Sequence, residues 1–351
     1  MRKIYFGHTR DGRPAHLYTL SNRSGLEVVL SDFGATIVSV KVSDRTGRVD
    51  DVVLGHGSLA EYENGQFFVG GTIGRYANRI ARGEFSLNGA KYLVSKNAPP
   101  NHLHGGFLGF HKRLWQVDSA AEQSGESIGF SYLSEDGEEG FPGGLSLTVH
   151  FRVPAQRNDL LVSFDARSDR DTIVNFTTHP YFNLAGFAAR DILGHQLRIN
   201  ARQYTPVDAE MIPTGELRDV ADSPFDFSTF TSIGARIDSD DPQLRLAGGY
   251  DHNWVVDPSA AEQREPAAEL FEPIGGRRLQ VFTTEPGLQF YSGNGLDGSI
   301  VARSGAACMR RNALCLETQH FPDSPNHANF PPVVLRRGSR FHSETTYRFS
   351  F

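Results

Sequence analysis

The sequence predicts an all-β protein, a large antiparallel β-sandwich with very little helix. Apolar and polar residues alternate with a period of two in several short segments, which is the pattern of half-buried strands. The chain has 36 glycines, scattered as turns between such segments, and this favours an antiparallel sandwich over an α/β fold. We expect a single domain over residues 1–351, because large β-sandwiches commonly exceed the usual domain length.

The predicted strands follow one another along the whole chain. Residues 37–42, 145–151 and 279–283 alternate at least in part. Residues 85–94 predict a hairpin, because an Asn-Gly pair between two strand-like runs is the strongest short-range hairpin signal. Residues 345–351 alternate again, so the C-terminus is expected to join a sheet.

One short helix is predicted after residue 256. Asp257 suits the N-cap and Pro258 the first helical position, and Pro266 would end the helix after about two turns. An inserted loop explains the same residues equally well.

Composition and charge restrict the partners. Hydrophobic residues make up 39% and charged residues 22%, as in a globular protein with ample core material. A net charge of -6 argues against nucleic acid and acidic membranes as partners, and favours a small neutral ligand. The sequence has no signal-like apolar stretch and no apolar segment of membrane-spanning length, so we expect a cytoplasmic protein.

The C-terminal third contains a carboxylate in apolar surroundings. The run 313–316 ends at Glu317, and a glutamate in such surroundings is costly to ionise and therefore available as a tuned acid or base. The two cysteines, Cys308 and Cys315, lie seven positions apart, which fits neither a zinc motif nor a disulfide framework. Cys315 is expected to pack within a strand.

Two polar clusters occur between residues 74 and 106. Arg75, Arg79 and Arg82 can form a solvated basic face, or Asn78 and Arg79 can donate hydrogen bonds to sugar hydroxyls. His102 and His104 would project to the same face of a strand, which raises the possibility of a metal site. Without a Cys or HExxH partner we expect no metal, and favour a structural role for one of the two histidines.

Further candidates lie at residues 177–184, 249–254 and 286–294. Pro180 makes His179 extended, so its ring is expected to project from a strand end. A lone histidine is more often a hydrogen-bonded core residue than a catalyst, but a pKa near 6.5 suits proton transfer in a cleft. Asp251 can simply cap a turn, and neighbouring aromatic residues belong to a core by default. Aromatic planes beside Asp, Asn and Gln also suit a pyranose.

These clusters form an ordered series of motifs. In order they are Gly-Arg-x-Ala-Asn-Arg-Ile, Asn-x-Leu-His-Gly-Gly, His-x-Tyr-Phe-Asn-Leu, Gly-x-Asp-His-Asn, Pro-Gly-x-Gln-Phe-Tyr-x-Gly-Asn and Leu-Glu-Thr-Gln. From about Leu30 to the C-terminus the chain closely resembles the aldose 1-epimerase (galactose mutarotase) family. The resemblance implies a galactose mutarotase-like supersandwich with an open sugar cleft. It also implies an isomerase that interconverts the α and β anomers of free hexoses, such as D-galactose and D-glucose, and of some pentoses, with no cofactor.

The resemblance also assigns roles to residues. Glu317 would be the general base on the C1 hydroxyl, and His179 would be the acid that protonates the ring oxygen. His104 would bind the ring oxygen and the neighbouring hydroxyl region. The remaining hydroxyls would be bound by Asn78, Arg79, Tyr181, Asp251 and Gln289. Opening a hemiacetal requires a base and an acid at the two oxygens attached to C1, and the absence of a nucleotide-binding loop agrees with a reaction that transfers neither electrons nor groups.

Some features leave alternatives open. Tyr76 and Pro180 depart from the family pattern, and Tyr76 is expected to alter the cleft wall. The segment 257–269 is expected to reshape the rim or a subunit contact. The rival functions are a non-catalytic sugar-binding or sensor protein, a glycoside hydrolase that uses Asp251 and Glu317, and an epimerase for pentoses or phosphorylated hexoses. The protein is expected to be a monomer or a homodimer.

Overall fold

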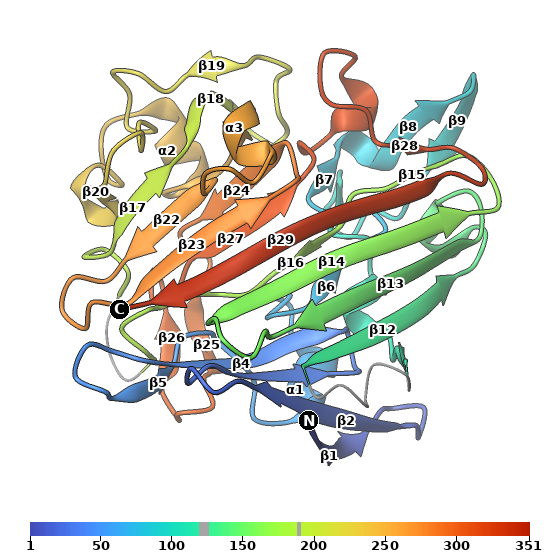
Figure 1. Cartoon of the computed structure of the whole chain (residues 1–351). Coiled ribbons are helices and arrows are strands. Elements are labelled where there is room, and N and C mark those ends of the chain that lie inside the picture. Colours follow the sequence, from blue (N-terminus) through green and yellow to red (C-terminus); the bar gives the residue numbers. More distant parts are fainter. Residues whose placement is uncertain (119–125, 188–190) are drawn as a thin grey trace.

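The regular secondary structure of the computed structural model is mostly antiparallel β-sheet, as predicted (Figure 1). It describes residues 1–118, 126–187 and 191–351. Within these ranges the α-helices are α1 (Leu59–Asn64), α2 (Pro242–Ala247) and α3 (Pro258–Ala261). None of the helices in the described ranges could span a membrane.

The largest sheet has nine strands and crosses the whole molecule (Figure 1). Its order is β11 (Gln116–Val117), β12 (Ser127–Ser134), β13 (Leu145–Arg152), β14 (Asp159–Ser168), β29 (Arg340–Ser350), β23 (Arg278–Thr283), β22 (Ala268–Phe271), β17 (Gln196–Ile199) and β20 (Thr231–Ser232). The C-terminal strand β29 lies between β14 and β23, so the end of the chain joins the two halves of the sheet. The predicted strands at 145–151, 279–283 and 345–351 all belong here.

Two five-stranded sheets accompany the large one. The N-terminal sheet consists of β1 (Arg2–His8), β2 (Pro14–Ser21), β3 (Glu27–Ser31), β4 (Thr36–Ser43) and β5 (Val49–Asp51) in sequence order. The other sheet has the order β19 (Arg218–Asp219), β18 (Ala201–Thr205), β21 (Asp251–Val256), β24 (Gly287–Tyr291) and β27 (Cys315–Gln319). The predicted strand at 37–42 is confirmed as β4, and Cys315 lies in β27 as expected.

Five two-stranded pairs complete the part of the fold that the structure describes. They are β6 (Thr72–Ile73) with β16 (Thr177–Thr178), β7 (Arg79–Ile80) with β10 (His102–Leu103), β8 (Glu84–Leu87) with β9 (Ala90–Leu93), β15 (Thr172–Ile173) with β28 (Val334–Leu335), and β25 (Asp297–Val301) with β26 (Ala307–Met309). The predicted hairpin at 85–94 is confirmed by β8 and β9. Asn88 and Gly89 both have positive φ, 51° and 79°, as the tight turn between them requires.

The predicted helix after residue 256 exists but is shorter than two turns. Asp257 caps α3, since its side chain accepts a hydrogen bond from the Ser259 N–H. The helix ends at Ala261 because Gln263 adopts a left-handed φ of 58°, which an α-helix cannot continue through. α3 packs against β23.

Alternation along the sheet of β21, β24 and β27 separates a core face from a polar face. Trp254, Phe290 and Leu316 are fully buried and belong to the main hydrophobic core. Their neighbours along each strand point the other way, because successive strand residues face opposite sides of a sheet. The polar face therefore carries Asp251, Gln289 and Glu317.

Candidate active site

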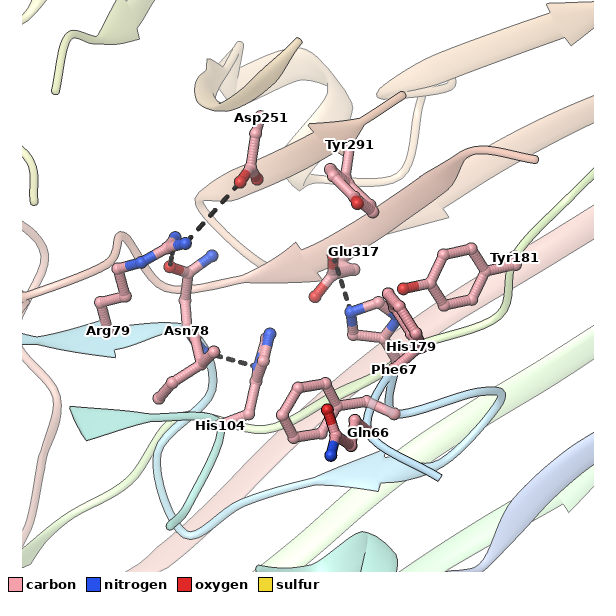
Figure 2. A pocket seen from close by; sticks show the side chains of 12 residues that line it. Gln66, Phe67, Asn78, Arg79, His104, His179, Tyr181, Asp251, Tyr291 and Glu317 are labelled. Carbon is pink, nitrogen blue, oxygen red and sulfur yellow. Dashed lines mark hydrogen bonds and ion pairs between the residues drawn. The ribbon is translucent and has the colours of Figure 1, made fainter. Parts of the chain in front are cut away.

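A cavity of about 160 Å³ opens over this polar face. At roughly 30 Å³ per water molecule it holds about five waters, so it suits one small ligand. Its lining consists of Gln66, Phe67, Phe68, Asn78, Arg79, Leu103, His104, His179, Tyr181, Asp251, Tyr291 and Glu317. All the predicted site residues except Gln289 are among them, and Figure 2 shows them converging from several strands and loops.

The register of the sheet explains why residues far apart in the sequence meet. Asp251 pairs with Tyr291 across β21 and β24, and Gln289 pairs with Glu317 across β24 and β27. Directly paired residues face the same side of a sheet, so these side chains share the cavity face. His179 follows β16 immediately, as expected for a ring that projects from a strand end.

Glu317 and His179 form a close pair of ionisable groups in the cavity. Glu317 Oε1 lies 3.5 Å from His179 Nε2, and both residues are buried (Figure 2). Burial raises the pKa of Glu317 well above its usual value, the charge of Asp251 raises it further, and Arg79 opposes both. Burial lowers the pKa of His179 to about 4. Burial therefore favours the neutral arrangement of the pair, with the proton on the Glu317 carboxyl group and not on the His179 imidazole.

His104 presents a hydrogen-bond donor to the cavity. Its Nδ1 accepts a hydrogen bond from the Asn78 backbone N–H at 3.1 Å. Burial and neighbouring positive charge hold the imidazole pKa well below its usual value, so the ring is neutral. A neutral ring that accepts at Nδ1 carries its hydrogen on Nε2, and Figure 2 shows this nitrogen pointing into the cavity.

The two histidines of the 101–106 motif do not share a face, which corrects the sequence-based expectation. β10 ends at Leu103 and His104 has a left-handed φ of 49°, so its side chain leaves the alternation of the strand. His102 is buried elsewhere, with Nδ1 2.7 Å from the Ser95 carbonyl oxygen. Gly105 and Gly106 follow with φ of 85° and 101°, conformations that glycine adopts without strain.

Three residues of the cavity have side chains that could in principle bind a metal ion. Among the described residues, His104, His179 and Glu317 place possible ligand atoms within 4.8 Å of one another. A metal ligand needs a free lone pair, but the cavity-facing nitrogen of His104 carries a hydrogen as long as Asn78 donates to Nδ1. The set is therefore better suited to a polar organic ligand than to a metal ion.

A second group of polar residues forms the opposite wall. Arg79 lies 3.8 Å from Asp251 between Nη2 and Oδ2, and it also donates to the Asn78 side chain at 3.4 Å. Gln289 does not line the cavity. It donates from Nε2 to Asp251 Oδ1 at 2.7 Å, so it fixes the orientation of that carboxylate from behind. Its Oε1 is buried without a partner among the described residues.

Aromatic side chains complete the cavity. The Tyr181 ring lies 5.0 Å from the His179 ring and 6.2 Å from the Tyr291 ring. Tyr291 accepts a hydrogen bond from the Gly295 N–H at 2.7 Å, which leaves its hydroxyl hydrogen free to donate. Apolar planes beside polar groups match the two faces of a sugar ring.

Comparison with known proteins decides the family. The sequence profile described as Aldose 1-epimerase matches residues 16–348. This chain belongs to the aldose 1-epimerase family. It is 40% identical over 325 residues to human galactose mutarotase, covering 93% of this chain and 91% of that protein. It is 38% identical over 341 residues to an aldose 1-epimerase of Escherichia coli K12, covering 97% and 96%.

Solved structures agree with the family assignment. A GalM/aldose epimerase homologue from C. elegans superimposes with a TM-score of 0.87 at 29% identity, covering 96% of this chain and 99% of the other. A galactose 1-epimerase from Lactobacillus acidophilus NCFM gives a TM-score of 0.86 at 27% identity, covering 99% and 98%. The predicted galactose mutarotase-like fold is therefore confirmed.

Residues of the first motif outside the cavity have structural roles. Arg75 is neither solvated nor in the cleft. It is buried and donates from Nη1 to the carbonyl oxygens of Pro142 and Gly143. Tyr76 is buried in a separate apolar cluster and donates to the Phe321 carbonyl oxygen at 3.1 Å, so the expectation that it alters the cleft wall is wrong. Arg82 is exposed, as in the solvated alternative.

Sequence analysis missed part of the lining. Tyr291 lines the cavity and lies in the predicted 286–294 motif, where its aromatic character favoured a core position. Gln66, Phe67 and Phe68 come from the loop between α1 and β6, and Leu103 separates the two histidines of its motif. The sequence signal for the loop is weak, consisting of two aromatic residues between glycines.

Proposed function

We propose that the protein is an aldose 1-epimerase, an isomerase that interconverts the α and β anomers of free aldoses such as D-galactose and D-glucose. The observation that carries the proposal is the contact between Glu317 and His179 within a cavity sized for one small ligand. Family membership and the polar and aromatic lining support it.

The proposed chemistry needs one base and one acid. Glu317 removes the proton of the C1 hydroxyl while His179 protonates the ring oxygen, and the bond between C1 and the ring oxygen breaks. The open-chain aldehyde rotates about its C1–C2 bond. Reclosure with the proton roles reversed gives the other anomer and restores both groups. No electrons or groups are transferred, so the reaction needs no cofactor.

The proton content of the pair suits this cycle. The reactive arrangement, an ionised Glu317 beside a protonated His179, and the neutral arrangement contain the same number of protons. Burial favours the neutral arrangement. Ring opening converts the charged arrangement into the neutral one, so the buried site stabilises the open-chain stage relative to the charged start.

The remaining lining residues orient the sugar. We assign the ring oxygen region to the Nε2–H of His104, and the other hydroxyls to Asn78, Arg79, Tyr181 and Asp251. Gln289 acts on a hydroxyl through its free Oε1, or on Asp251 alone. Tyr291 and the aromatic residues of the 65–71 loop supply apolar planes for the C–H faces of the ring.

The charges of the cavity argue against the rival functions. Arg79 is the cation of the described lining, and Asp251 lies 3.8 Å from it, so a phosphorylated hexose would meet no unpaired positive charge. A glycoside hydrolase would need both carboxylates free, but Asp251 is held by Gln289 and Arg79. A non-catalytic sensor would not need an acid and base pair.

Location and assembly follow as further parts of the proposal. We place the protein in the cytoplasm, as a monomer or a homodimer, with a monosaccharide as its small-molecule substrate. Its two cysteines are free and buried, as is usual in a reducing compartment.

Polarimetry tests the proposal. Purified protein is added to freshly dissolved α-D-galactose, α-D-glucose and a panel of other aldoses, and the approach to anomeric equilibrium is followed. We expect an acceleration over buffer with at least one of these sugars. Spontaneous rates with every aldose would contradict the proposal.

A further inference from the structure

Phe68 has a backbone conformation that a bulky residue rarely adopts. It lies in the loop between α1 and β6 and has a left-handed φ of 56°. Such a conformation costs free energy and persists only where the surroundings determine it, and it is common at active sites. Two polar residues of the same cavity, Asn78 and His104, also have left-handed φ, 62° and 49°.

The Phe68 ring contacts three imidazoles. Its centroid lies 4.6 Å from that of His104, 4.7 Å from that of His111 and 6.0 Å from that of His179. The rings of His104 and His179 are themselves 5.2 Å apart. One aromatic ring therefore packs against both histidines to which the proposed mechanism gives a role.

The loop is fixed to His179 through the backbone. The Gly70 N–H donates to the His179 carbonyl oxygen at 2.9 Å, and the His179 N–H donates to the Gly71 carbonyl oxygen at 3.0 Å. At the other end of the loop, Lys112 Nζ donates to the carbonyl oxygens of Tyr62 and Gly65 at 2.7 and 2.6 Å. The position of the Phe68 ring is therefore set relative to the imidazole of His179.

We propose that Phe68 is a positioning residue, which holds the imidazoles of His104 and His179 in place and keeps water away from them. The role rests on the proposed epimerase function and deepens it. A fixed His104 keeps its Nε2–H directed at the ring oxygen region, and a dry His179 is a stronger acid once protonated.

The electrostatics of the two histidines agree with this role. Burial is the largest cause of the lowered pKa of both rings. His179 faces Glu317 at 3.5 Å, the Cys315 thiol at 3.5 Å from Nδ1, and Tyr181, while His104 also experiences the charges of Arg79 and His111. Removing the Phe68 ring admits water without changing any of these partners, so the pKa of His179 should rise toward 6.5.

The test compares Phe68→Ala and Phe68→Leu with a matched control. Phe330 is buried and packs on His327 with ring centroids 4.6 Å apart, and it does not line the cavity. Phe330→Ala therefore removes the same kind of aromatic–histidine contact elsewhere. Each variant is examined by polarimetry for kcat and KM, by thermal unfolding, and by NMR titration of the imidazole of His179, assigned with His179→Asn.

For Phe68→Ala we expect kcat to fall about tenfold or more with KM changed less than about threefold. We also expect the His179 ring to titrate between about pH 5 and 7, where the wild-type ring stays neutral. In kcat and in the His179 titration, Phe68→Leu should lie between the wild type and Phe68→Ala. It provides the same measurements if Phe68→Ala does not fold. Phe330→Ala should lose thermal stability alone.

An unchanged His179 titration in both Phe68 variants would overturn the proposal, as would equal losses of kcat in Phe68→Ala and Phe330→Ala. An inactive wild type would instead contradict the proposed function. The NMR titration does not depend on turnover, so it would still decide whether Phe68 keeps His179 dry.

Discussion

Replacing Glu317 by glutamine tests the assignment of the base. The amide preserves the shape of a side chain that is 2% exposed, but it cannot accept the proton of the C1 hydroxyl. Loss of a general base typically costs about 10²–10⁴-fold in rate, or about 3–5 kcal/mol at 1.36 kcal/mol per factor of ten. Sugar affinity should largely survive, because the hydroxyl-binding wall at Asn78, Arg79 and Asp251 is untouched.

The same substitution has an effect on stability whose sign the structure determines. Because folding raises the pKa of Glu317, the protonated form is favoured in the native state. The stability contributed by this group is present below its unfolded pKa of about 4.5 and declines as pH rises toward the folded pKa, by at most about 1.4 kcal/mol per pH unit. Glu317→Gln avoids this decline, so at neutral pH it should be at least as stable as the wild type.

A matched control is available in another buried carboxylate beside a histidine. Glu285 Oε2 lies 2.7 Å from His320 Nδ1, away from the cavity lining. Glu285→Gln should lower stability, because it removes one partner of a buried pair, but leave mutarotation unchanged. Calorimetry measures sugar affinity, polarimetry the rate and denaturant titration the stability. A rate for Glu317→Gln within about threefold of the wild type would refute the assignment and point to Asp251 as the base.

The same geometry leads to expectations for two further variants and for the pH dependence of the wild type. His179→Asn removes the acid, so kcat measured by polarimetry should fall about 10²–10⁴-fold, while sugar binding measured by calorimetry is retained. A kcat close to that of the wild type would contradict the role of His179. The mutarotation rate of the wild type should fall below about pH 4, because His179 becomes protonated beside a protonated Glu317. It should fall again above the raised pKa of Glu317, where the pair loses its proton. A series of rates against pH with no fall near pH 4 would contradict this assignment. Asp251→Asn removes a charge that raises the pKa of Glu317, so the fall in rate at high pH should move to lower pH, while KM increases. A fall in rate at the same pH as in the wild type would show that Asp251 does not act on Glu317.

The sequence was informative where the structure depends on local pattern. The alternation in 145–151 and 279–283 and the turn at Asn88 produced the expected strands and hairpin, because period and turn chemistry act over a few residues. The ordered motifs identified seven residues that meet in the cavity. Their meeting depends on the register of β21, β24 and β27, which joins segments distant in the chain and cannot be read from periodicity.

The sequence-based expectations that differ from the structure also depend on tertiary contacts and on backbone conformations that periodicity does not reveal. His102 and His104 were expected on one face, but the left-handed backbone at His104 turns its ring toward the cavity, and strand alternation does not reveal such a φ. Gln289 donates to Asp251 from behind the cavity lining, so its predicted contact with a sugar hydroxyl stays a prediction. Phe68 was missed because its place depends on a loop held by tertiary contacts.

The most direct test of the account is the polarimetric decay of freshly dissolved α-D-galactose, measured with wild type, Glu317→Gln and Glu285→Gln side by side. The account predicts fast mutarotation by the wild type and by Glu285→Gln, and a rate near that of buffer with Glu317→Gln. Equal rates for all three proteins would contradict the claim that Glu317, paired with His179, performs the chemistry.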